Sequence, residues 1–286
     1  METAIRLENV VKKYPKFTLD HINLELPKGC IMGLVGENGA GKTTLIKCIL
    51  GLISLSDGRI YRDEKVISKK EIEWKNDVGV VMSGSSFPGN LNAKQINKIM
   101  ENIYSRWDKN IFYDYLKQFH IDENKFTKDY STGMAMKLQI AVAFSHNAKL
   151  LLLDEATSGL DPVVRDEILE ILQNFIQDEE CTVLFSSHIT SDLEKVADYI
   201  TFLHKGKLIF SENKDELLYN YGVVRCSKED YKRIDPEHVV GLRKNQFGYE
   251  VMVDNRIDIS RQNRDWVVDS TTLEEIILFQ IKGDVL

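Results

Sequence analysis

The sequence predicts an α/β fold built around a mostly parallel sheet, and two segments far apart in the chain carry this prediction. The first is the glycine-rich stretch 36–43, which follows an apolar run and precedes a stretch of helical character. The second is the apolar run 150–153, which ends in Asp154 and Glu155. A short apolar run of this kind suits a parallel strand that is buried on both faces. Acids at its carboxyl end are expected at the crevice where open α/β sheets bind ligands.

The stretch 36–43, Gly-Glu-Asn-Gly-Ala-Gly-Lys-Thr, is typical of a phosphate-binding loop. Its glycines allow several backbone N–H groups to surround a β-phosphate, and the following helix points its positive end at the same charge. Lys42 is expected to reach the β- and γ-phosphates, and the Thr43 hydroxyl to ligate Mg²⁺. The alternative is a chance glycine-rich turn between a strand and a helix. The residues predicted to bind the nucleotide here are Gly36, Glu37, Asn38, Gly39, Ala40, Gly41, Lys42, Thr43 and Thr44.

The two carboxylates suit the other half of a site for a magnesium-bound nucleotide. Asp154 is placed to hold Mg²⁺, directly or through water. Glu155, one residue further on, could orient an attacking water and take its proton. The alternative is a strand that ends in solvated acids. We favour the magnesium–nucleotide site over solvated acids, because the phosphate-binding loop upstream needs such carboxylate partners.

The other segments alternate as an α/β fold requires. Residues 1–30 predict short strands and turns, and 78–82 predict a further apolar strand. The region from about 84 to 147 is predicted to be largely helical, because 93–104 and 110–119 carry apolar residues at helical spacing.

Residues 148–210 return to alternating strands and helices. Asp161 followed by Pro162 indicates an N-cap and a first helical position, so a helix is expected through Ile176.

The segment 213–286 forms an extension beyond this α/β region. The runs 223–226 and 249–253 predict strands, and Asn-Gln-Phe-Gly at 245–248 suits a hairpin turn. A helix is predicted over 271–281, because its first two residues are threonines that each precede a glutamate by three positions.

Length and composition are those of a globular protein with one large core. The chain has 286 residues, of which 28% are charged and 43% hydrophobic, enough for one domain and an appendage. Its formal net charge of -7 disfavours nonspecific nucleic-acid binding, which needs clustered Lys and Arg.

Cysteine spacing and hydropathy exclude several further classes. The four cysteines form no close pair, so reduced thiols are expected rather than zinc ligands. No run approaches the ~18 apolar residues that span a bilayer. The first six residues do not resemble a secretory signal. A membrane part, if the protein serves transport, is expected in another polypeptide.

Further motifs show a resemblance to the ATP-binding cassette (ABC) ATPases, in the family's order over about residues 5–210. Tyr-Ser-Thr-Gly-Met at 130–134 is similar to the signature motif, and Ser-Gly-Leu-Asp at 158–161 to the D-loop. His188, after an apolar run and two serines, resembles the switch histidine. Tyr14 stands where the family places an aromatic ring against adenine. The residues so assigned are Ser131, Thr132, Gly133 and Met134 in the signature, and Asp161 in the D-loop.

The resemblance implies a P-loop NTPase core of the ABC ATPase type. Such a core has a mostly parallel sheet, an antiparallel β subdomain and a helical subdomain, here about 84–147. The ATPase domain is expected at 1–212, and a small α+β C-terminal extension at 213–286. ABC ATPases pair head to tail around two ATPs. Ser131 and the amides near Gly133 would therefore face the γ-phosphate bound by the other copy.

ATP and Mg²⁺ are the cofactors that the resemblance implies, and Lys42, Glu155 and His188 the catalytic residues. His188 would contact the γ-phosphate and steady the water held by Glu155. The alternative is that this histidine lies in the core with its hydrogen bonds satisfied there.

The chain departs from the family at several positions. Ser83, which begins the serine-rich stretch 83–86, takes the place of the usual glutamine or glutamate. A serine hydroxyl is shorter than these side chains, which disfavours direct contact with Mg²⁺, although a water bridge is open to it. Because this loop reports nucleotide state to the permease in the family, that coupling is expected to be built differently here. Thr132, Met134 and Ala156 also differ, in ways that hydrolysis should tolerate.

The resemblance therefore predicts the ATP-hydrolysing subunit of a bacterial-type ABC transporter. Its partners would be a separate integral membrane permease and a second ATPase subunit, identical or related, with no nucleic acid. It would lie in the cytoplasm, on the inner face of the membrane. Export of drugs, antimicrobial peptides or other amphipathic compounds is favoured over import. The alternatives are a soluble ABC ATPase that acts on ribosomes or DNA, and a hydrolysis-impaired partner in a heterodimer. The extension is either an inert appendage or a regulatory or dimer-bridging element.

Overall fold

The chain folds into two compact units, Met1–Ser211 and Glu212–Leu286. The computed structural model describes residues 2–67, 73–84, 87–246, 248–262 and 266–283. The observed division lies one residue from the boundary predicted after residue 212.

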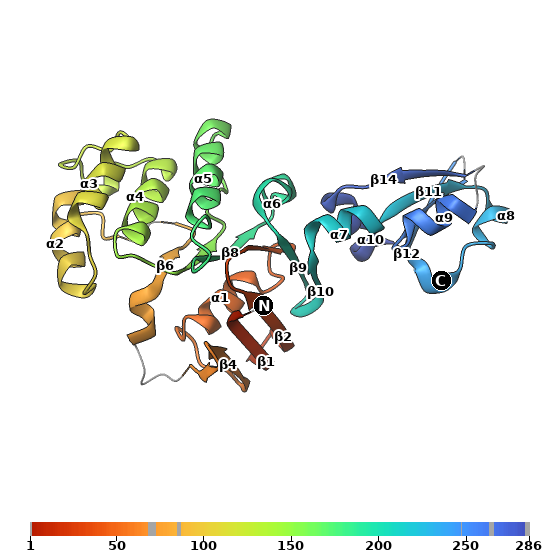
Figure 1. Cartoon of the computed structure of the whole chain (residues 1–286), viewed down its shortest axis with the longest axis horizontal. Coiled ribbons are helices and arrows are strands. Elements are labelled where there is room, and N and C mark those ends of the chain that lie inside the picture. The colour runs from red at the N-terminus through yellow and green to blue at the C-terminus, as the bar shows by residue number, and fades with distance from the viewer. Residues whose placement is uncertain (1, 68–72, 85–86, 247, 263–265, 284–286) are drawn as a thin grey trace. The chain divides into compact units, whose positions relative to one another are not determined.

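A six-stranded sheet forms the centre of the first unit (Figure 1). The strand order is β10-β9-β3-β8-β7-β6, and the pairs β6–β7, β7–β8, β8–β3 and β3–β9 are parallel. Every residue of β3 and β7 is buried, as their continuous apolar sequences predict. The strands are β3 (Ile31–Val35), β6 (Val78–Val81), β7 (Leu150–Asp154), β8 (Thr182–Ser187), β9 (Tyr199–His204) and β10 (Lys207–Asn213).

A second sheet of the first unit has the order β2-β1-β4-β5, and its neighbouring strands are antiparallel. The strands are β1 (Thr3–Tyr14), β2 (Phe17–Pro27), β4 (Asp57–Arg62) and β5 (Lys65–Val66). The prediction of short strands over residues 1–30 was wrong, because β1 and β2 are 12 and 11 residues long. Register shifts in β1, and positive φ angles at Asn9 and His21, interrupt the alternation that would have revealed long strands.

Helix α1 (Lys42–Ile49) joins the two sheets through a shared hydrophobic core. Leu45 and Ile49 of the helix are buried there with Leu7 of β1 and Leu152 of β7. The start of α1 is therefore held at the carboxyl end of β3, where the glycine-rich loop lies.

The region between β6 and β7 is helical, as predicted. Helices α2 (Ala93–Ile103), α3 (Lys109–Gln118) and α4 (Thr132–Phe144) pack in that order (Figure 1). Asn92 and Gln95 form a capping box at the start of α2. The remaining helical elements of the first unit are α5 (Pro162–Phe175), α6 (Thr190–Val196), and the short 3₁₀ turns Glu73–Asp77 and Thr127–Asp129.

Helix α4 lies directly against β6. A Cβ added to Gly79 would lie 3.0 Å from the Ala143 Cβ and 2.5 Å from Leu151 Cδ2 of β7, so glycine suits this close crossing. His146, just after the helix, is 1% exposed, and its ring nitrogens lie 3.0 and 3.2 Å from the Val142 and Val78 carbonyl oxygens. Burial lowers the pKa of His146 from its ordinary value.

The second unit contains a four-stranded antiparallel sheet with the order β12-β13-β11-β14. Pairing of Asn245 with Gly248 confirms the predicted hairpin, although Phe247 of its turn lies outside the described residues. The Thr272 side chain accepts from the Glu275 N–H, which confirms the predicted cap of α10. The elements are α7 (Lys214–Asn220), β11 (Gly222–Cys226), α8 (Lys228–Tyr231), the 3₁₀ turn Pro236–His238, β12 (Val239–Asn245), β13 (Gly248–Val253), α9 (Arg256–Gln262), β14 (Val267–Ser270) and α10 (Leu273–Lys282).

The cysteines are free thiols, as predicted. Burial raises the pKa of Cys30 to about 12 and that of Cys48 and Cys181 to about 11, so these three remain protonated. Cys226 of the second unit is half-buried and also free. Across the described stretches of the chain, no helix combines the length and the apolar character that crossing a membrane demands.

Candidate functional site

The glycine-rich loop connects β3 to α1, and its backbone depends on glycine at particular positions. Gly41 has a φ of 115° and is the N-cap of α1, a conformation that other residues rarely adopt. A Cβ on Gly36 would lie 2.4 Å from the Leu203 carbonyl oxygen. The loop therefore follows a path that brings its amides and the start of α1 to one point, which suits an anion.

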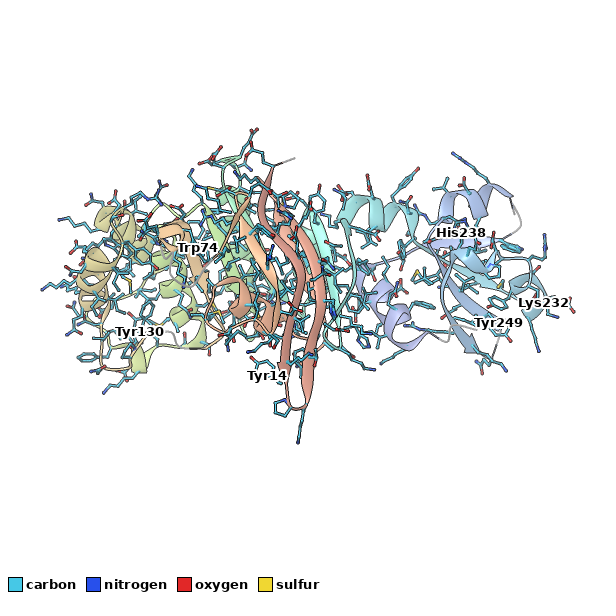
Figure 2. The ribbon with its side chains drawn as sticks, turned by 90° about the horizontal axis from the view of Figure 1, so that it is seen from below. Tyr14, Trp74, Tyr130, Lys232, His238 and Tyr249 are labelled. Carbon is cyan, nitrogen blue, oxygen red and sulfur yellow. The ribbon has the colours of Figure 1, made fainter. Side chains whose placement is uncertain are left out.

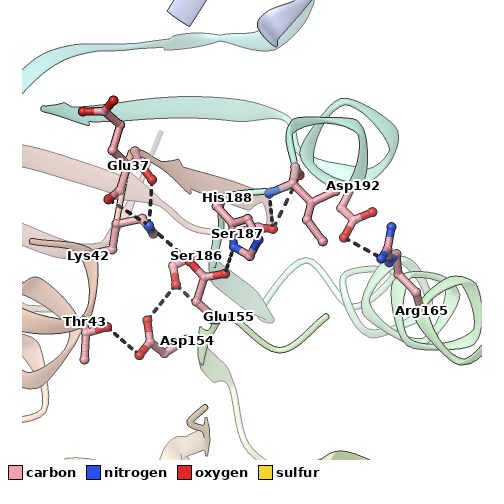
Figure 3. A network of polar contacts seen from close by, with 12 residues as sticks. Glu37, Lys42, Thr43, Asp154, Glu155, Arg165, Ser186, Ser187, His188 and Asp192 are labelled. Atoms are coloured by element: carbon pink, nitrogen blue, oxygen red, sulfur yellow. Dashed lines mark hydrogen bonds and ion pairs between the residues drawn. The ribbon is translucent and has the colours of Figure 1, made fainter. Parts of the chain in front are cut away.

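Lys42 is buried beneath this loop rather than extended into solvent. Its Nζ donates to the Gly36 carbonyl oxygen at 2.7 Å, and it lies 3.1 Å from Oε1 of Glu155 (Figure 3). The residue is only 5% exposed. The ammonium group is thus held next to the place where the loop would receive a phosphate.

Asp154 lies fully buried at the end of β7, between two hydroxyl groups (Figure 3). Its Oδ2 accepts from Thr43 Oγ1 at 2.8 Å, and its Oδ1 accepts from Ser186 Oγ at 2.8 Å. Ser186 is the partner of Asp154 in the β7–β8 register. The carboxylate and the Thr43 hydroxyl are neighbouring oxygen ligands of the kind Mg²⁺ prefers, so these residues fit the ion.

Glu155 turns sharply away from the strand that precedes it. Its φ is 54°, which is uncommon for a residue other than glycine and marks a strained backbone. Its N–H donates to the carbonyl oxygen of Ser186 at 3.0 Å and to the hydroxyl of the same residue at 3.1 Å. The turn directs the carboxylate towards Lys42 and His188.

His188 follows β8 and contacts the second carboxylate oxygen. Its Nδ1 lies 2.5 Å from Oε2 of Glu155 (Figure 3). The side chain is 44% exposed, so the alternative of a satisfied core histidine was wrong. One carboxylate is therefore held between a buried ammonium and an exposed imidazole.

A cleft of about 500 Å³ lies over this cluster. Tyr14, labelled in Figure 2, is not among the described residues that line it. The residue is 42% exposed, and Lys12 Nζ lies 5.1 Å from its ring centroid. Phe17 does line the cleft, and its ring would meet a Cβ on Gly41 at 2.9 Å. The lining residues are Lys16, Phe17, Glu37, Asn38, Gly39, Gly41, Lys42, Thr43, Thr44 and Glu155.

The signature and D-loop residues lie at helix starts away from this cleft. Ser131 caps α4, with its Oγ accepting from the Met134 N–H at 3.2 Å. Asp161 caps α5 in the same way, through the N–H groups of Val163 and Val164. Within the described chain, none of the residues 131–134 lines the cleft. One copy thus brings together the loop, both carboxylates and His188, and keeps the signature apart from them.

Sequence reasoning missed two contributors to the site. Ser186 holds both Asp154 and the Glu155 backbone, and its only signal was a polar residue at the end of an apolar run. Lys16 reaches the cleft because Tyr14 pairs with Phe17 across the β1–β2 turn, a register that residue types alone did not reveal.

Comparisons with known proteins agree with this geometry. The family model described as ABC transporter matches residues 19–158. The lantibiotic transport ATP-binding protein SrtF of Streptococcus pyogenes is 34% identical over 225 residues, which cover 76% of this chain and 96% of that protein. The bacitracin transport ATP-binding protein BcrA of Bacillus licheniformis is 31% identical over 266 residues, covering 91% of this chain and 85% of that protein.

Solved structures show the same fold. The chain is similar to cbiO1 of Clostridium perfringens, part of an ABC transporter complex, with a TM-score of 0.64 and 23% identity over 77% of this chain and 92% of that one. It is also similar to a dimeric ATP-binding cassette bound to ADP and Pi, with a TM-score of 0.67 and 21% identity over 73% of this chain and 98% of that one.

Proposed function

Because this chain belongs to the ABC transporter family as an ATP-binding and ATP-hydrolysing subunit, we propose that two such subunits close over ATP to drive a separate membrane permease. ATP on the loop 36–43 of one subunit would meet the signature 131–134 of the other. The observation that carries this proposal is that one copy gathers Lys42, Asp154, Glu155 and His188 but holds its signature elsewhere.

The site residues have distinct proposed roles in hydrolysis. Thr43 and Asp154 would hold Mg²⁺, which neutralises charge on the β- and γ-phosphates when bound. The ATP phosphates would attract Lys42 Nζ, which lies 3.1 Å from Glu155. Glu155 Oε1 would then be free to accept the proton of the attacking water. His188, at 2.5 Å from the other carboxylate oxygen, would orient Glu155 and contact the γ-phosphate.

The partner subunit would complete the site with a helix start. Ser131 ends the loop before α4, and its hydroxyl is the helix cap. At Gly133, an added Cβ would make only ordinary contacts, with Val164 Cγ1 at 3.7 Å and Leu160 Cδ2 at 3.8 Å. The positive end of α4 and the O–H donor of Ser131 suit a γ-phosphate. Hydrolysis of this phosphate would weaken the closed pair.

Two relatives indicate a class of transported compound, because they are named for lantibiotic and bacitracin transport. We therefore propose export of peptide antibiotics or similar amphipathic compounds, with this chain on the cytoplasmic face of the membrane. Residues 1–212 would form the ATPase domain and 213–286 an accessory domain. The second subunit would be a copy of this chain or a close relative.

Purification from detergent-solubilised cells tests the transport assignment. Tagged protein is expected to recover an integral membrane protein of several spans, and the yield should depend on the tagged subunit rather than on bound nucleic acid. An untagged strain is the control, and nuclease treatment should leave the yield unchanged. Recovery of ribosomes or DNA without a membrane protein would support the soluble alternative instead.

Nucleotide affinity tests the aromatic residue assigned to adenine. Tyr14→Ala is expected to weaken ATP binding by about 5- to 150-fold, because loss of one base-stacking ring costs about 1–3 kcal/mol. Titration with a fluorescent ATP analogue measures the change.

Phe17→Ala is the matched comparison, since Phe17 also lies beside the loop. If Tyr14→Ala binds normally and Phe17→Ala does not, the stacking ring is Phe17. Normal binding by both variants would mean that neither ring holds the adenine.

A further inference from the structure

The loop after β6 is bound on both sides of Ser83 by one buried side chain. Gln139 of α4 accepts the Met82 N–H through Oε1 at 3.0 Å, and its Nε2 donates to the Gly84 carbonyl oxygen at 2.9 Å. Gln139 is 2% exposed, whereas Ser83 is exposed. A single amide thus spans the three-residue stretch 82–84 and leaves the serine side chain outside.

Helix α4 lies beside β6, the strand before the loop (Figure 1). Among the described residues, this bridge is the first of three contacts that join α4, or His146 just after it, to β6 and the loop. The close crossing at Gly79 and Ala143 is the second. The third is His146, whose Nε2 lies 3.2 Å from the Val78 carbonyl oxygen. Attachments along the whole of β6 mean that the helix, the strand and residues 82–84 form one packed unit.

This unit carries two segments with different tasks, and the antiparallel course of α4 and β6 places both towards the start of the helix. Ser131 caps α4 and begins the proposed contact with the partner's ATP. Gln139, about two turns further along the helix, contacts the loop in which Ser83 replaces the usual glutamine or glutamate. A shift of α4 would therefore be passed to the loop through Gln139, because a buried amide that lost either partner would leave polar groups unsatisfied.

We propose that Gln139 is a positioning residue that couples the signature end of α4 to the loop 82–84. In this chain the loop takes its position from the signature helix behind it, rather than from a long side chain at position 83. This inference rests on the proposed function, since it requires ATP to act on Ser131 of the partner.

Hydrogen exchange with mass spectrometry tests the coupling, with two peptides read in one sample. The parent protein carries Glu155→Gln so that ATP and Mg²⁺ remain bound. In the parent, ATP is expected to slow exchange both in a peptide from the signature, 131–136, and in one from the loop, 79–84. In Gln139→Met, which keeps the length but lacks the amide, only the signature peptide should respond.

Two further variants sharpen this test. Gln139→Asn keeps the amide but is one carbon too short to span both partners, so it should behave like Gln139→Met. Without ATP, both should exchange the Met82 amide about tenfold faster, the factor expected for one lost hydrogen bond. Gln118→Met, on the exposed end of α3, makes the same chemical change outside the bridge and should behave like the parent.

The two peptides distinguish failure of the coupling role from failure of the proposed function. If the loop of a folded Gln139 variant still responds to ATP as strongly as the parent does, the coupling role is wrong. If the signature peptide of the parent does not respond to ATP, the proposed function fails instead. Should Gln139→Met not fold, Gln139→Asn decides, because it retains a polar group for the buried backbone.

Discussion

Glu155→Gln is expected to lower ATP turnover by about 10²–10⁴-fold, the usual contribution of a positioned general base. This corresponds to roughly 3–5 kcal/mol of activation free energy. The amide cannot take a proton from water, although it has almost the same shape as the carboxylate. ATP binding should persist, because Lys42 would lose only its ion pair with Glu155 and still reach the phosphates. Phosphate release at saturating ATP and equilibrium binding measure the two effects separately.

The comparison for this variant is Glu170→Gln, a matched change at an exposed position of α5. It should hydrolyse ATP at the parent rate. Turnover of Glu155→Gln within a few-fold of the parent rate would remove Glu155 from the role of base. Loss of ATP binding in the same variant would instead indicate that its contact with Lys42 shapes the loop.

Elements set by local chemistry could be predicted from the sequence. Strands β3 and β7 are short apolar runs, and burial on both faces leaves such runs few other places in a fold. Asp161, which precedes Pro162, satisfies backbone amides at the start of α5. Thr272, three residues before a glutamate, does the same at the start of α10. These signals depend on a few neighbouring residues, so they hold without knowledge of the tertiary structure.

Features that depend on packing between distant segments could not be predicted. Nothing about Gln139 indicates that it reaches the loop at residues 82–84, because that contact requires α4 to lie on β6. Phe17 reaches the cleft only through the register of the β1–β2 hairpin. The roles of Lys42 and Glu155 remain predictions about chemistry, although their contact supports them.

Asp154→Asn is expected to lower ATP turnover by about 10²–10³-fold at low Mg²⁺, comparable to the loss of one preorganised electrostatic contact in an active site. The reason is that a neutral amide oxygen holds a divalent cation less well than a carboxylate does. Raising the Mg²⁺ concentration should restore part of the activity, because the lost step is binding of the ion. Turnover measured across a Mg²⁺ titration checks this dependence.

The fold should survive this change, which makes the result interpretable. Asp154 accepts from the hydroxyls of Thr43 and Ser186, and a hydroxyl can rotate to accept from the new amide instead. Asp114→Asn, at an exposed position of α3, is the matched control and should leave the Mg²⁺ dependence unchanged. If Asp154→Asn instead keeps full activity at low Mg²⁺, the ion is held by Thr43 and the phosphates alone. If the variant unfolds, the main role of the buried carboxylate is to hold α1, β7 and β8 together rather than to bind the metal ion.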